Sequence, residues 1–169
     1  MSICRSLAER MGGRLWADAR EGHGSTFHFT ALVAVAQGPP APHLRAHQPV
    51  LDRRSVWIVG GSPATQQLLI NQTRFWGMAP RATGSTAEAL GWLADGSPDI
   101  VVVDRTHLAS ADALDQFGAV PVIELVTLAQ AHEAASRPVA ALLTKPLKCA
   151  RLHAHLVSQL GAGATAATP

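Results

Sequence analysis

Apolar positions along residues 54–160 fall into four short runs and a weaker strand-like segment at 80–82, separated by longer segments in which apolar residues are spaced as on a helix. Runs buried on both faces that alternate with helices are typical of parallel sheets, whose crossovers are right-handed. The pattern predicts an α/β unit with a doubly wound, five-stranded parallel sheet. The expected strands are 55–59, 80–82, 100–103, 120–125 and 140–143, and the expected helices are 63–76, 85–94, 128–136 and 148–160.

Residues 1–35 have a different and shorter pattern. Ser2 can cap a helix that runs to about Met11, where Gly12 and Gly13 end it. Two strands follow, over 14–19 and 25–34, with a turn between them. One helix and one hairpin are too little for an independent core, so we expect this segment to be part of a larger α+β domain.

The two patterned regions are joined by residues 36–53, which contain four prolines and one glycine. This composition argues against helix and strand and predicts a partly extended linker. Residues 161–169 are low in complexity, and we expect a disordered tail there. The predicted organisation is therefore 1–35, a linker over 36–53, the α/β unit over 54–160, and the tail.

Composition excludes several classes of function. The net charge of +2 over 169 residues is too small to indicate a nucleic-acid surface. Two distant cysteines and scattered histidines, including His153, which we expect to be exposed, show no metal-ligand spacing. No apolar stretch is long enough for a membrane helix, and charges interrupt any signal-peptide pattern. We therefore expect a cytoplasmic chain that itself contacts neither membrane nor nucleic acid.

The most informative single residue is Asp104, which directly follows the apolar run 100–103. The carboxyl end of a strand is where a parallel α/β sheet presents functional side chains. An aspartate there could accept a phosphoryl group, bind a cation or cap a turn. The first two roles call for Mg²⁺, which takes an octahedral shell of oxygen ligands and so needs further carboxylates nearby.

Three segments resemble response-regulator receiver domains. They are 87–90, with the sequence Ala-Glu-Ala-Leu, 98–104, which ends in Asp104, and Thr144-Lys145-Pro146-Leu147. The resemblance implies a flavodoxin-like sheet, with Asp104 at the phosphoacceptor position and Lys145 at the position that contacts the phosphate.

The chain departs from the receiver pattern at the metal site. Gly60 and Gly61 stand where the family has two acidic residues that hold Mg²⁺, so we expect no metal site. Val126 takes the place of the Ser or Thr that bonds the phosphate, and Thr127 follows one place later, on the other face of the strand. The segment between Asp104 and the fourth strand is short, which predicts an abbreviated third helix. We expect Lys145, or else Arg105, to pair with Asp104.

The first unit resembles the last segment of a histidine-kinase ATP-binding domain. The residues that show this resemblance are 2–13 and the stretch Glu21-Gly22-His23-Gly24-Ser25-Thr26-Phe27. Gly22, Gly24 and Thr26 would be the remnant of that family's ATP-domain motif. The rest of its ATP site and its phosphoacceptor-histidine helix have no match, so ATP and Mg²⁺ are expected only in a full-length parent, and no cofactor is expected in this chain.

These resemblances predict a fragment of a hybrid sensor histidine kinase, or the product of a truncated gene, with no kinase activity alone. The leading hypothesis is a pseudo-receiver that docks on the kinase core of its parent, which could be membrane-anchored, or of a related sensor kinase. The alternative is a genuine receiver in which Asp99, Glu124 or Ser62 recruits the metal for phosphorylation of Asp104. A third is an inert fragment. The oligomeric state stays open.

Overall fold

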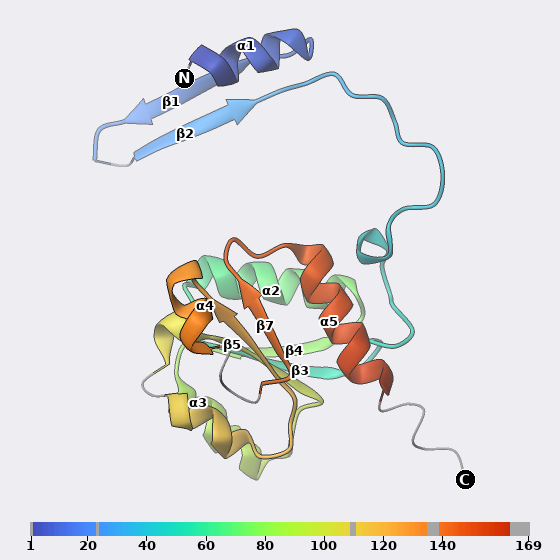
Figure 1. The fold of residues 1–169 in the computed structure, drawn as a ribbon, viewed down its shortest axis with the longest axis vertical. Coiled ribbons are helices and arrows are strands. Elements are labelled where there is room, and N and C mark those ends of the chain that lie inside the picture. Colours follow the sequence, from blue (N-terminus) through green and yellow to red (C-terminus); the bar gives the residue numbers. More distant parts are fainter. Residues whose placement is uncertain (1, 23, 109–110, 135–138, 163–169) are drawn as a thin grey trace. The chain divides into compact units, whose positions relative to one another are not determined.

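The computed structural model describes residues 2–22, 24–108, 111–134 and 139–162. The chain divides into two compact units, Met1–Pro39 and Pro40–Pro169 (Figure 1). The boundary lies inside the predicted linker. Most of the predicted tail, residues 163–169, lies outside the described residues.

The first unit is the helix and hairpin that the sequence predicts. Helix α1 (Ser2–Arg10) precedes strands β1 (Leu15–Arg20) and β2 (Gly24–Phe29), which pair in antiparallel register from Leu15–Phe29 to Arg20–Gly24. Gly22 and Gly24 have φ angles of 74° and 81°. This left-handed conformation suits glycine, so both glycines favour the tight connection between the strands. Among the described residues of the chain, no helix is long and apolar enough to cross a bilayer.

The second unit contains the predicted five-stranded parallel sheet. Its strands lie in the order β4-β3-β5-β6-β7 (Figure 1). The chain begins with β3, adds β4 at the edge beside it, and then adds β5, β6 and β7 in turn towards the opposite edge. Neighbouring strands pair in parallel throughout. The doubly wound α/β prediction is confirmed. The strands are β3 (Ser55–Val59), β4 (Ala79–Thr83), β5 (Ile100–Asp104), β6 (Val122–Val126) and β7 (Ala141–Thr144).

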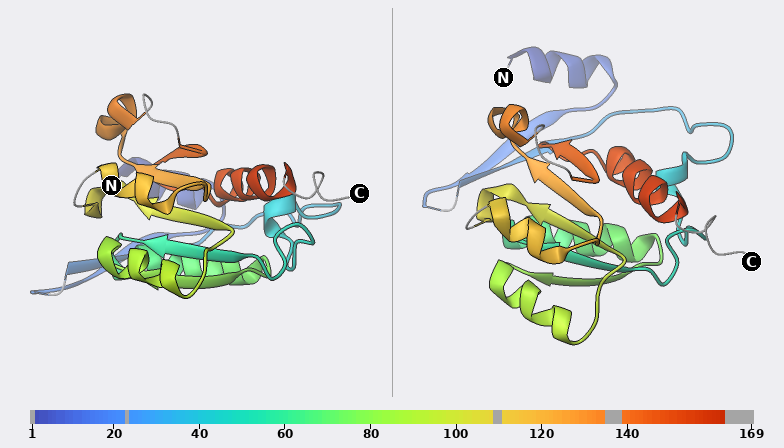
Figure 2. Two further views of the ribbon diagram at one scale, coloured as in Figure 1. Left: turned by 90° about the horizontal axis from the view of Figure 1, so that it is seen from below. Right: turned by 60° about the horizontal axis from the view of Figure 1, so that its bottom comes forward.

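Helices cover both faces of this sheet, and alternate strand residues enter two separate cores (Figure 2). Ile58 and Val102 face α2 (Pro63–Phe75) and α5 (Cys149–Ala162). Val59 and Val103 face α3 (Thr86–Gly91) and a 3-10 helix at Ala111–Phe117. That 3-10 helix stands in the place of the abbreviated third helix. Helix α4 (Leu128–Ala134) follows β6 and packs beside β6 and β7.

Residues 40–54 differ from the predicted linker because they pack on the second unit; we call them the strap. The backbone N–H groups of His47 and Gln48 donate to the carbonyls of Phe75 and Trp76, at 3.1 and 2.9 Å. The last carbonyl groups of a helix have no hydrogen-bond donors within the helix. At the end of α2, the strap supplies these donors. Leu51 is fully buried in the core with Trp76. The proline-rich composition therefore does not leave this segment free.

The strap also lies against α5 through an aromatic cluster. The Trp76 indole donates to the carbonyl oxygen of His43 at 3.0 Å, and the Trp76 ring meets His153 edge-on at 5.1 Å. His153 is 7% exposed, so the expectation of an exposed histidine is wrong. Burial, and then the proximity of His43, lower the pKa of His153. A neutral imidazole therefore packs where the strap meets α5.

The strap predicts a specific loss of stability. Leu51→Ala removes a fully buried side chain from the core, and we expect the free energy of unfolding to fall by about 2–5 kcal/mol. Leu44→Ala makes the same chemical change in the strap at a side chain that is 59% exposed, so its effect should stay within about 0.5 kcal/mol. Urea unfolding of the whole chain, followed by tryptophan fluorescence, measures both. Equal midpoints for the two variants would mean that the strap is not part of the folded unit.

Candidate functional site

Asp104 is the last residue of β5, and its side chain is 2% exposed. The chain turns directly into the 3-10 helix Arg105–His107, and Asp104 caps that turn by accepting the Thr106 backbone N–H at 3.1 Å. The Thr106 hydroxyl also donates to the same carboxylate oxygen, Oδ1. Of the three roles that its position suggests, turn capping is therefore present in the geometry.

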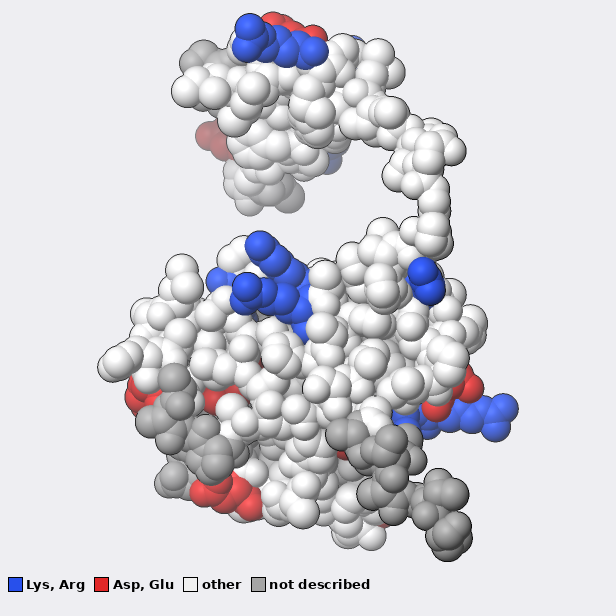
Figure 3. All heavy atoms as spheres, turned by 45° about the vertical axis from the view of Figure 1, so that its right-hand side comes forward, with Lys and Arg blue, Asp and Glu red and all other residues white. Residues whose placement is uncertain are grey.

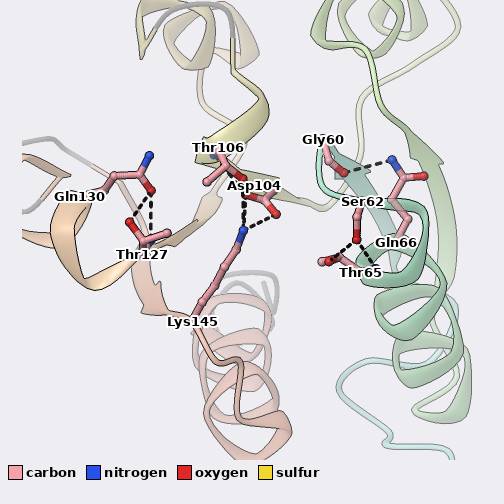
Figure 4. A network of polar contacts seen from close by, with 9 residues as sticks. All are labelled: Gly60, Ser62, Thr65, Gln66, Asp104, Thr106, Thr127, Gln130 and Lys145. Atoms are coloured by element: carbon pink, nitrogen blue, oxygen red, sulfur yellow. Dashed lines mark hydrogen bonds and ion pairs between the residues drawn. The ribbon is translucent and has the colours of Figure 1, made fainter. Parts of the chain in front are cut away.

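Lys145 reaches Asp104 from the segment that follows β7. Its backbone N–H donates to the Val126 carbonyl at 2.8 Å, which fixes the start of the side chain beside β6. The Lys145 ammonium then donates to Oδ1 and Oδ2 of Asp104, at 2.7 and 2.6 Å (Figure 4). A third contact, to the Thr106 hydroxyl, measures 3.2 Å. The predicted ion pair is present, and both carboxylate oxygens are engaged.

The charge state of Asp104 follows from these contacts. Burial alone would raise its pKa, because a carboxylate is poorly solvated in the interior. The Lys145 ammonium and the Thr106 hydrogen bonds stabilise the ionised form and outweigh burial, so the net pKa of Asp104 is lowered. The site therefore holds an ionised aspartate whose charge is matched by one internal cation.

The loop after β3 faces this pair but offers no carboxylate. Gly60 and Gly61 have φ angles of 77° and 81°, and a Cβ built on Gly61 would lie 3.2 Å from Asp104 Oδ2. Ser62 caps α2, since its hydroxyl accepts the Thr65 N–H at 3.2 Å. Gln66 donates to the Gly60 carbonyl at 3.1 Å, which holds the loop against the start of α2 (Figure 4).

The other acidic side chains proposed as metal ligands have partners of their own, Asp99 through both carboxylate oxygens and Glu124 through one. Asp99 lies at the start of β5, the opposite end from Asp104, where it accepts from Arg54 at 2.8 Å and from the Ser55 backbone at 2.7 Å. Glu124 is fully buried on β6, and the Arg105 guanidinium donates to it at 3.1 Å. No group of three His, Cys, Asp or Glu side chains able to hold a metal occurs among the described residues. The residues present thus do not fit the oxygen shell of Mg²⁺.

Arg105, the other residue expected to pair with Asp104, pairs with two glutamates instead. Its guanidinium bridges Glu124 on β6 and Glu133 on α4, at 3.1 and 2.9 Å. Lys145 is therefore the residue that pairs with Asp104, and Arg105 ties the turn after β5 to α4.

Val126 and Thr127 occupy the end of β6 as the sequence suggests. Val126 is fully buried. The Thr127 backbone N–H and hydroxyl both donate to Gln130 Oε1 at 3.0 Å, so the Gln130 side chain reaches back to the residue that precedes α4 (Figure 4). Thr127 thus serves the helix rather than the Asp104 pocket.

Sequence reasoning missed Thr106, although a signal for it exists. Aspartate side chains often accept a hydrogen bond from the backbone N–H two residues later, and threonine at that place adds a hydroxyl. Asp104 and Thr106 follow this pattern.

Gly22, Gly24 and Thr26 belong to the first unit, whereas Asp104 and Lys145 belong to the second. Gly22 and Gly24 frame the hairpin turn, and a Cβ on either would meet no atom within 4 Å. Thr26 pairs with Asp18 across the hairpin and is exposed.

Comparisons with known proteins place these features in context. No protein-family model matches the chain. It is 43% identical over 44 residues, 26% of this chain and 12% of the relative, to the adaptive-response sensory-kinase SasA of Prochlorococcus marinus. It is 27% identical over 172 residues, 95% of this chain and 14% of the relative, to the sensor protein EvgS of Escherichia coli. The chain therefore spans only about an eighth of the length of these curated relatives.

Solved structures resemble the second unit. A response-regulator receiver domain from Clostridium thermocellum matches with a TM-score of 0.59 and 16% identity, covering 66% of this chain and 98% of that one. The receiver domain of a sensor histidine kinase from Pseudomonas aeruginosa, solved with a magnesium ion in its active-site cleft, matches with a TM-score of 0.57 and 20% identity, covering 64% and 98%. The second unit has the receiver fold, and the chain is similar in sequence to sensor kinases.

Proposed function

We propose that the second unit is a pseudo-receiver, a docking module of a two-component phosphorelay that has lost Mg²⁺-dependent phosphorylation of Asp104. One observation carries this proposal. The Lys145 ammonium holds both oxygens of Asp104, while Gly60 and Gly61 offer no side-chain oxygen to a metal.

Phosphoryl transfer explains why this arrangement argues against chemistry. Catalysis of that reaction is mostly positioning and neutralisation of the charge on the phosphoryl oxygens, which a bound metal provides by bridging them. A single ammonium already paired with the acceptor supplies no such bridge. The geometry therefore favours a structural ion pair.

The partner that we propose is the kinase core of a parent protein or of a related sensor kinase. Similarity to a sensor protein extends over 95% of this chain and supports that setting. We further propose that the first unit is the last segment of a histidine-kinase ATP-binding domain. Its helix and hairpin, with glycines at the turn, agree with that resemblance, and ATP and Mg²⁺ would be bound only by the complete domain.

A genuine phospho-accepting receiver is the second candidate. The position of Asp104 at the carboxyl end of β5 favours it. The two candidates differ in whether a metal and a phosphate analogue bind at Asp104.

The ion pair predicts the acid–base behaviour of Asp104. Its folded pKa is lowered, so its contribution to stability is present above about pH 3.9, the ordinary aspartate pKa, and is lost as the pH falls through the lower folded value. Lys145→Met removes the cation and leaves burial opposed only by Thr106, so the pKa of Asp104 should rise. Carboxyl ¹³C NMR titration of Asp104 measures this. Lys148→Met, which removes an exposed lysine, is the control. An unchanged pKa in Lys145→Met would contradict the role of the pair.

Titration with beryllofluoride, a phosphate analogue, tests the loss of phosphorylation. With millimolar Mg²⁺ present, we expect no saturable change in the amide resonances of Asp104 or Gly61. The receiver domain from Pseudomonas aeruginosa that binds magnesium provides the positive control. Saturable binding that Asp104→Asn abolishes would reject the pseudo-receiver and support the phospho-accepting alternative.

A further inference from the structure

The first part of the strap, residues 40–48, is only lightly attached to the second unit; we call it the latch. Backbone hydrogen bonds to the end of α2 and the bond from the Trp76 indole to the His43 carbonyl join it to the unit. All of its residues are exposed except His43 and Gln48, which are half-buried, and none belongs to either apolar core. The rest of the strap is anchored by the fully buried Leu51. The latch can therefore leave the unit without disrupting a core.

Internal hydrogen bonds make the latch a compact loop. The Gln48 side chain donates to the carbonyls of Pro42 and Arg45, at 2.8 Å each, and the Arg45 guanidinium donates to the Pro40 carbonyl at 2.9 Å. The backbone of His47 has a φ angle of 49°, a left-handed conformation that costs free energy for a residue other than glycine. The latch thus keeps its own structure, and part of its backbone is strained.

His153 of α5 meets the latch in a place that suits only a neutral imidazole. The residue is 7% exposed, and its Nε2 is buried and has no hydrogen-bond partner among the described residues. The Trp76 ring meets it edge-on, and His43 lies close enough to lower its pKa further than burial does. A protonated imidazole carries N–H groups on both nitrogens. Protonation would therefore leave a charged donor buried without an acceptor, which is costly.

The groups around this contact do not balance a charge on His153. Charged and titratable residues on the packed elements are His43, Arg45, His47, Asp52, Arg53 and Arg54 in the strap, Arg74 in the last turn of α2, and Arg151 and His155 on α5. β7, on which α5 also packs, has none. Of these groups, His43 is the one that acts on the pKa of His153, and it lowers it. Figure 3 shows mostly uncharged side chains where the connecting chain joins the second unit.

We propose that the latch is a pH-sensitive switch, in which protonation of His153 releases residues 40–48 from α2 and α5 while Leu51 keeps the rest of the strap in place. Release adds about 30 Å of extended chain to the connection between the two units. The length of that connection would then respond to pH. This switch goes beyond the docking role proposed above and does not depend on it.

The direction of the pH response follows from the environment of His153. The open latch gives the ring access to water and the ordinary histidine pKa of about 6.5, whereas the closed latch lowers that pKa. The closed form therefore binds the proton less tightly. Its advantage is fully present above about pH 6.5 and is lost as the pH falls from there through the lowered value of the closed latch.

An NMR titration of the whole chain, from about pH 8 to about pH 5, tests the proposal. The indole N–H of Trp76 and the backbone amides of His47 and Gln48 report the hydrogen bonds that hold the latch. We expect the open fraction to rise by up to about tenfold for each pH unit below about 6.5. The amides of Ile58 and Val102, in the core of the sheet, should stay unchanged over this range.

Two variants assign the response to one histidine. His153→Phe keeps an aromatic ring beside Trp76 but cannot be protonated, so the latch should stay closed throughout the titration. His155→Phe changes a half-buried histidine two positions along the same helix, and this matched control should respond as the unaltered chain does.

Three results would overturn the proposal. An unchanged pH response in His153→Phe would assign the response to another group. Movement of the Ile58 and Val102 resonances together with those of the latch would mean that acid unfolds the whole unit. A pKa of 6.5 or above for His153, read from its own imidazole resonances in the unaltered chain, would remove the driving force. That last reading needs no variant and holds even if His153→Phe does not fold.

Discussion

The ion pair between Asp104 and Lys145 is the interaction on which the site depends. It joins the end of β5 to the segment after β7, across the intervening strand β6. Such a pair is an uncertain source of net stability, but removing one partner leaves an unmatched charge in a buried place. Lys145 is thus the counter-ion of Asp104, and each residue balances the charge of the other.

The architecture of the second unit rests on its apolar packing rather than on the site around Asp104. Two apolar cores, on opposite faces of the sheet, hold the strands in place, and neither includes Gly60 or Gly61. Asp104, at the end of β5, is likewise a member of neither core. Fold and chemistry are therefore separable here, as they are in other widely used folds.

The sequence predicted the sheet and the position of Asp104 at a strand end, because buried strands appear as apolar runs whose ends are easy to identify. It also predicted Lys145 as the partner, through a resemblance in which both residues have fixed places. It did not predict the strap, since its prolines resemble a linker and its backbone donors find carbonyls at the distant end of α2. The contacts of Arg105 with Glu124 and Glu133 were equally hidden, because neither periodicity nor spacing encodes side-chain pairs across strands.

Paramagnetic broadening by Mn²⁺, which substitutes for Mg²⁺ at oxygen sites, tests most directly whether Lys145 has replaced the metal. The structure predicts that the amides of Gly61 and Asp104 broaden no more than that of Asp18, whose carboxylate is exposed in the first unit. Selective, saturable broadening at Gly61 and Asp104 that disappears in Asp104→Asn would contradict the account. It would mean that the pocket still holds a divalent cation despite the two glycines.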